Sequence, residues 1–189
     1  MKKHTFLLFL LPLPLLLLAA CSSEAAQSVE TAEEQAEKEL DAEIYIPEFE
    51  EYPIVSAEII SFPMASSKSL LVTYSREKGS LKSGELISNH EETVGSEVIY
   101  GIYEGDPILF KITFDKNEII SGDGSHELRT VNGESVLYHE TTSGDKEYLT
   151  AFFNGEQGSY SFEFMLTDEL TEDEAYWVIS TVIQGQNSN

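Results

Sequence analysis

The chain of 189 residues has few basic residues and almost no cysteine. It contains 11 Lys and Arg against 34 Asp and Glu, for a net charge of −23, and its only basic run is Lys2-Lys3. Phosphate recognition depends on clustered basic side chains, so this composition argues against a protein that binds nucleic acid. Cys21 is the single cysteine, so no intramolecular disulfide can form and stability must come from a packed core. The 41% hydrophobic content is sufficient for one globular domain.

The first 20 residues have the pattern of a secretory signal peptide. Lys2 and Lys3 precede an apolar run over residues 6–18 that is interrupted by Pro12 and Pro14. This arrangement is typical of the charged and hydrophobic regions of an export signal. A membrane-spanning helix requires about 20 apolar residues, and two prolines within the run would each remove a helical hydrogen bond. We therefore predict a signal peptide over residues 1–20.

The run ends in Leu18-Ala19-Ala20-Cys21, which resembles the lipobox of bacterial lipoproteins. The resemblance implies cleavage before Cys21, a diacylglyceryl thioether on its thiol and acylation of the new amino terminus. Two or more acyl chains give stable membrane anchoring, whereas one holds only marginally. The alternative is an ordinary secretory signal that leaves a free thiol, although Leu18 occupies a position where that signal prefers a small residue.

Cleavage would make the chain still more acidic. It removes Lys2 and Lys3 and no acid, so the net charge changes from −23 to −25. Repulsion from anionic headgroups would leave the acyl chains on Cys21 as the only membrane contact. The predicted location is the extracytoplasmic face of the cell membrane.

Residues 21–43 are expected to form a flexible acidic tether. The stretch 22–42 contains six Glu, and Val29 and Leu40 are its only large apolar residues. A short helix over 31–38 is the alternative, because these residues are good helix formers. We favour the tether, since a helix without a large apolar stripe has little to pack against.

The folded part is predicted to be one α+β domain over residues 44–185, followed by a frayed tail over 186–189. Runs with the apolar content and the alternation of strands fall at 55–62, 70–74, 98–103, 108–114, 128–131, 135–138, 147–153 and 160–166. In the clearest run, Ile108, Phe110, Ile112 and Phe114 alternate with other residues, so they should share the core face. Long helices between strands are missing, which disfavours parallel crossovers. The expected fold is a curved, half-barrel-like antiparallel sheet.

Turn and cap residues complete this prediction. Asn132-Gly133 and Asn154-Gly155 suit tight hairpin turns. Thr171 and Glu174 form a capping box for a C-terminal helix that buries an apolar stripe against the sheet and stops at Gly185. The stretch 81–93 is compatible with either a strand or a helix.

Searches for catalytic and metal-binding patterns yield weak candidates. His90, His126 and His139 each precede a glutamate, but no second histidine follows at the spacing of zinc proteases. Asp115-Lys116-Asn117 begins like a calcium loop, yet isoleucines occupy the later ligand and glycine positions, and Asp123-Gly124-Ser125 is interpreted as a solvated turn. No nucleophile elbow, phosphate-binding loop or dinucleotide motif occurs. We predict no catalytic residue, metal ligand or cofactor, and Cys21 is the one assigned site residue.

Many aromatic residues fall on the predicted strands, with two interpretations. They could line a concave sheet face that grips an apolar or peptide ligand, or they could be ordinary cross-strand packing, which is the commoner case. The residues concerned are Tyr100, Tyr103, Tyr138, Tyr148, Phe152, Tyr160, Phe162 and Phe164.

The C-terminal part carries a second resemblance. The hairpin 128–138 with Val131-Asn132-Gly133, the strands around Asn154-Gly155 and the helix over 171–183 are similar to a Gram-positive extracytoplasmic domain of unknown function. That domain occurs in small lipoproteins and behind the membrane helix of some anti-sigma factors, and its usual Trp on the penultimate strand is replaced here around Ala151-Phe152. The resemblance implies a curved antiparallel sheet carrying a helix, distantly similar to the lipoprotein-carrier half-barrel, with no catalytic residues.

Three hypotheses for function follow from the sequence. The first is a non-enzymatic, lipid-anchored binding or sensing domain whose partner is an envelope protein or an apolar ligand. The second is an envelope hydrolase using scattered acids and His126 or His139. The third is a structural adaptor lipoprotein.

Overall fold

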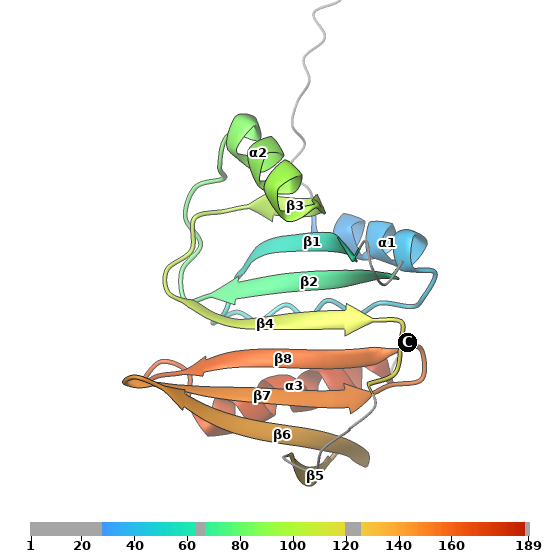
Figure 1. Ribbon diagram of the computed structural model, residues 1–189, viewed down its shortest axis with the longest axis vertical. Coiled ribbons are helices and arrows are strands. Elements are labelled where there is room, and N and C mark those ends of the chain that lie inside the picture. Colours follow the sequence, from blue (N-terminus) through green and yellow to red (C-terminus); the bar gives the residue numbers. More distant parts are fainter. Residues whose placement is uncertain (1–27, 63–66, 120–125, 188–189) are drawn as a thin grey trace, which may run out of the picture.

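The computed structural model describes residues 28–62, 67–119 and 126–187, which form one α+β unit (Figure 1). Cys21, the predicted signal peptide over residues 1–20 and Asp123-Gly124-Ser125 lie outside the described residues. The elements in chain order are α1 (Val29–Leu40), β1 (Ile54–Phe62), β2 (Ser67–Ser75), α2 (Gly84–Val94), β3 (Ser96–Ile102), β4 (Ile108–Asp115), β5 (Glu127–Val131), β6 (Glu134–Ser143), β7 (Lys146–Asn154), β8 (Ser159–Leu166) and α3 (Glu172–Gln186).

All eight strands join one open antiparallel sheet in the order β3-β1-β2-β4-β8-β7-β6-β5. Each of the eight predicted strands is confirmed. β5 to β8 form a meander, whereas the chain from β3 to β4 passes across β1 and β2, so β4 and β8 join the two halves at the centre. The predicted α+β class and the helix on one face of the sheet are confirmed, and the sheet does not close into a barrel.

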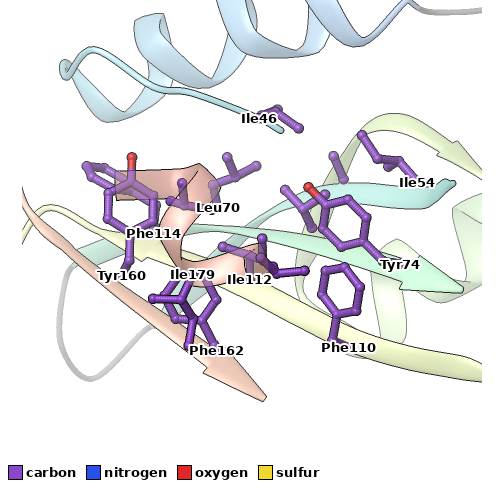
Figure 2. Close-up of a cluster of buried hydrophobic side chains, with 14 of the residues drawn as sticks. Ile46, Ile54, Leu70, Tyr74, Phe110, Ile112, Phe114, Tyr160, Phe162 and Ile179 are labelled. Carbon is purple, nitrogen blue, oxygen red and sulfur yellow. The ribbon is translucent and has the colours of Figure 1, made fainter. Parts of the chain in front are cut away.

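Aromatic and aliphatic rows across the central strands form the core. Phe110 of β4 lies between Tyr74 of β2 and Phe164 of β8, and the Tyr74 and Phe110 rings stack 4.5 Å apart. In Figure 2, Ile46 and Ile179 reach the same cluster from the segment after α1 and from α3. Burial of each such side chain stabilises the fold by about 1.5–3 kcal/mol.

Ile108 departs from its predicted position. Phe110, Ile112 and Phe114 are buried as expected, but Ile108 is exposed and Leu109 is buried instead. The register between β2 and β4 shifts at Tyr74 and Ser75, so the alternation of inward and outward side chains breaks at the start of β4.

The predicted tether over residues 21–43 is wrong for residues 29–40, which form α1 and belong to the core. Ala32, Ala36 and Leu40 recur every fourth residue and are at most 5% exposed. The two alanines bury little area themselves, but they let the helix backbone approach closely. Glu33 and Glu37 also accept hydrogen bonds from the backbone N–H groups of Ile46 and Ile44, at 2.6 and 3.3 Å.

The predicted cap of α3 is confirmed, and its predicted end is wrong. Thr171 and Glu174 form the capping box, and the predicted apolar stripe faces the sheet. The helix continues through Gly185 to Gln186. Glycine serves there for close packing, since a Cβ at position 185 would lie 2.1 Å from Cε1 of Tyr45.

The two Asn-Gly sequences behave differently. Asn132 and Gly133 have φ of 51° and 92°, which confirms the tight hairpin turn between β5 and β6. Asn154 and Gly155 do not have positive φ, so the same prediction is wrong there. Instead, residues 155–158 connect β7 to β8, and the Gly155 N–H donates to the Gly158 carbonyl at 2.7 Å.

Residues 81–93, which the sequence leaves open between strand and helix, contain most of α2. Leu81 forms an isolated bridge to Tyr103 before the helix begins, and Ser83 caps its first turn. No side chain of α2 is buried, so polar contacts must hold the helix against β3.

Candidate functional site

A buried glutamate lies on the side of the sheet opposite α1 and α3. Strand alternation in β1 directs Ala57 and Ile59 into the core and places Glu58 on the other side. Glu58 is nevertheless only 5% exposed. A carboxylate removed from water in this way is costly unless hydrogen bonds or charges compensate it.

Three side chains compensate Glu58. Oε2 contacts His90 Nε2 at 2.7 Å and accepts from Ser96 Oγ at 2.9 Å, while Oε1 accepts from Ser56 Oγ at 3.2 Å. Among the described residues, no lysine or arginine forms an ion pair with this carboxylate. The cluster therefore combines an acid, an imidazole and two hydroxyls without a permanent positive charge.

His90 belongs to α2, and polar contacts hold this helix in place. Glu91 Oε1 accepts from the Val98 N–H at 2.9 Å, and the Gly95 carbonyl accepts from the Ser61 N–H at 3.5 Å. With no buried side chain on α2, the His90–Glu58 contact is one of its main attachments to the sheet. The His90 side chain is 37% exposed, so its ring can reach both Glu58 and solvent.

The cluster opens into a pocket of about 460 Å³ between α2, β1, β2 and the β3–β4 connection. Its walls carry the acids Glu58, Glu104 and Asp106 against the single lysine Lys82, with His90 alongside. Val55 and Ile102 contribute apolar wall. This volume suits a small molecule, and the excess of acids favours a ligand that carries positive charge.

The Lys78 ammonium group lies over two tyrosine rings beside this pocket. Its Nζ lies 3.9 Å from the ring centroid of Tyr103, which lines the pocket, and 4.7 Å from that of Tyr100. It also donates to the Tyr100 hydroxyl. These rings already bind a cation of the chain itself, which is the geometry of a cation–π contact.

Most of the aromatic residues considered as a ligand face are core. Tyr138, Tyr160, Phe162 and Phe164 are at most 2% exposed, which confirms the packing interpretation for them. The side chains of α3 against the sheet are likewise at most 1% exposed, so the described residues leave no apolar cleft there. Only Tyr103, Tyr148 and Phe152 remain partly accessible among the eight.

The three histidines do not converge on one site. His90 pairs with Glu58, whereas His126 and His139 lie together near the opposite end of the sheet, with ring centroids 5.4 Å apart. In the part of the chain that the structure describes, no group of three or more His, Cys, Asp or Glu side chains is arranged to hold a metal ion. Asp115, the last residue of β4, accepts hydrogen bonds from Ser69 Oγ and from the backbone and side-chain N–H groups of Asn117.

A second hollow of about 480 Å³ lies at the C-terminal end of α3. Glu43, Glu134 and Glu156 line it together with the backbone around Gly155. It holds acids without the histidine and hydroxyl partners of the Glu58 pocket. The described residues therefore favour the Glu58 pocket as the site with the richer chemistry.

Sequence reasoning did not identify Glu58. Its partners are 2, 32 and 38 residues away, so only the fold brings them together. The one available signal was an acid flanked by apolar residues within a predicted strand, at the segment Ala57-Glu58-Ile59.

Comparison with known proteins adds no evidence to these observations. No family model, no curated protein and no solved structure matches it. Within the described ranges, no helix is both long enough and apolar enough to cross a bilayer.

Proposed function

We propose that this chain is a lipid-anchored extracytoplasmic binding domain, held to the membrane through Cys21, that takes a small positively charged ligand in the Glu58 pocket. The lipobox-like sequence before Cys21 supports the location. The observation that carries the binding role is a 5% exposed carboxylate at the wall of a 460 Å³ pocket. Its neighbours are neutral hydroxyls and one imidazole, which leaves negative potential for a ligand amine.

The ligand expected from this geometry has an amine or guanidinium group and a modest apolar part. The charged group would approach Glu58, Glu104 or Asp106, and the remainder would lie against Val55 and Ile102. This differs from the apolar ligand expected from the sequence, because the interface between α3 and the sheet is closed by packed side chains. Charge-assisted hydrogen bonds to a carboxylate are roughly twice as strong as neutral ones.

The membrane anchor would keep the pocket near the bilayer. Only residues 22–28 separate Cys21 from the start of α1, and seven residues span at most about 25 Å when fully extended. The charge of −25 on the processed chain opposes contact with anionic headgroups. The domain would therefore meet soluble ligands or the membrane-proximal parts of envelope proteins.

Binding is tested by calorimetric titration of the full-length protein in detergent with arginine, choline, putrescine and spermidine. The proposal predicts saturable binding of at least one amine, weakened about tenfold or more in Glu58→Gln. Glu163→Gln is the matched control, because Glu163 is an exposed acid outside the pocket. No binding by any of the four, or equal loss in both variants, would contradict this role for the pocket.

A hydrolase is a second candidate, which the 2.7 Å contact between His90 and Glu58 favours. A carboxylate that orients an imidazole is the arrangement used for general acid–base catalysis. Among the described residues, no hydroxyl forms a hydrogen bond with the other ring nitrogen of His90, so a nucleophile would have to be water. Turnover of ester or amide probes that disappears in His90→Gln would favour the hydrolase over the binding domain.

A further inference from the structure

His126 and His139 lie side by side at the edge of the sheet. β5 and β6 are antiparallel, with Glu127 opposite Tyr138 and Leu128 opposite Leu137. Continued by one residue beyond the start of β5, this register brings His126 beside His139. Tyr138 is buried in the core, and strand alternation therefore directs His139 to the other face of the sheet. The ring centroids lie 5.4 Å apart at an interplanar angle of 53°.

This separation matches two imidazoles that share one metal ion. A zinc–nitrogen bond of about 2.0–2.1 Å places each ring centroid about 3.2 Å from the ion, because the centroid lies roughly 1.1 Å behind the nitrogen. At a tetrahedral angle the two centroids would then be about 5.2 Å apart, and at a right angle about 4.5 Å. The observed centroid separation of 5.4 Å lies close to the tetrahedral value.

The surroundings hold one of these rings in place. Phe152 of β7 contacts His126 edge-on, with ring centroids 5.8 Å apart at 81°. The backbone of His139 is fixed as well, because Thr150 Oγ1 donates to its carbonyl at 3.1 Å. Both histidine side chains are partly exposed, so an ion can enter from solvent.

Neither of the neighbouring acids, Glu127 and Glu140, supplies a third ligand. Glu127 pairs with Arg129, whose Nε lies 3.0 Å from Glu127 Oε1. Glu140 is the next residue after His139 in β6 and therefore lies on the other face of the sheet. The described residues accordingly supply two nitrogen ligands, and water would fill the remaining positions.

We propose that His126 and His139 form a two-histidine site for a divalent transition metal, with water as the remaining ligands. Imidazole nitrogen suits Cu²⁺, Ni²⁺ and Zn²⁺, and Cu²⁺ binds most tightly in this series. The net charge of −23 raises the local concentration of cations around the site. This site is separate from the Glu58 pocket, so either can fail without the other.

The test is titration of the full-length protein in detergent with CuSO₄, followed by electron paramagnetic resonance, and with ZnCl₂ by calorimetry. We expect one site whose spectrum shows coupling to two imidazole nitrogens. His126→Gln and His139→Gln should each weaken binding about tenfold or more, since either change removes the chelate. His90→Gln is the matched control and should leave the site unchanged.

Three results would contradict the proposed metal site. Absence of binding, or binding that survives both substitutions, would overturn the proposal and assign any bound metal to other groups. An equal loss in His90→Gln would show that metal binding does not depend on the His126–His139 pair and would also contradict the proposal. His126→Gln keeps the test valid if His139→Gln does not fold, because His126 precedes β5, whose paired residues begin at Glu127.

Discussion

Replacing Gly185 by alanine tests the contact between α3 and the segment that follows α1. Inside a helix, glycine to alanine normally stabilises by about 0.5–1 kcal/mol. Here the added Cβ would lie 2.1, 2.3 and 2.6 Å from three atoms of the Tyr45 ring. Normal carbon contacts are about 3.5–4.0 Å, so the ring must move by more than an ångström.

Overpacking of this kind costs about 1–3 kcal/mol, which exceeds the gain in helix propensity. We therefore expect Gly185→Ala to lower the free energy of unfolding by about 1–2 kcal/mol and the melting temperature by about 2–8 °C. In a Tyr45→Ala background the obstacle is absent, and the same change should instead stabilise by about 0.5–1 kcal/mol. Calorimetric melting of the four proteins in the double-mutant cycle measures both values.

The decisive result is that Gly185→Ala lowers the free energy of unfolding when Tyr45 is present and raises it when Tyr45 is replaced by alanine. If Gly185→Ala stabilised the protein with Tyr45 intact, the ring would not lie against the helix as described. If Gly185→Ala destabilised equally in both backgrounds, the cost would come from another source than Tyr45.

Two further predictions concern the helices. Ala36→Asp places a charge at a fully buried position of α1 and should destabilise the fold by about 3 kcal/mol or more. Glu34→Asp, at an exposed position of the same helix, should change the stability little. Equal urea denaturation midpoints for the two variants would show that α1 is not packed in the core. Thr171→Ala should cost about 1 kcal/mol through the lost cap. Hydrogen bonds from the Thr171 backbone and hydroxyl lower the pKa of Glu174 below 4.5, so this stabilisation is present above pH 4.5 and is lost as pH falls through the lowered value. The cost of Thr171→Ala should therefore shrink in acid melts, and a constant cost would contradict this linkage.

The sheet could be predicted because each strand carries its own signal. Alternation of apolar and polar residues located all eight strands, and the Asn132-Gly133 turn fixed one hairpin through its positive φ values. Strand order could not be predicted, because the placement of β4 beside β8 depends on residues about 50 positions apart. Local patterns contain no information on such pairings.

The failures have a physical cause as well. The sequence favours a tether over the alternative helix at 31–38 because Ala32 and Ala36 contribute close approach of the backbone rather than hydrophobic area, and hydropathy does not measure close approach. The sequence predicts a helix stop at Gly185 because the packing role of this glycine depends on Tyr45, which comes 140 residues earlier in the chain. The Glu58 cluster was missed for the same reason, since His90 and Ser96 meet it only in the folded sheet.

The most direct test of the proposed function is the intact mass of the protein extracted from the membranes of cells that produce it. We predict a chain that begins at Cys21, carries a diacylglyceryl group on that residue and is found in the membrane fraction. A Cys21→Ser variant should lack the lipid and leave the membrane. An unmodified Cys21, or a variant that remains as firmly bound to the membrane, would contradict the lipid anchor and the location inferred from it.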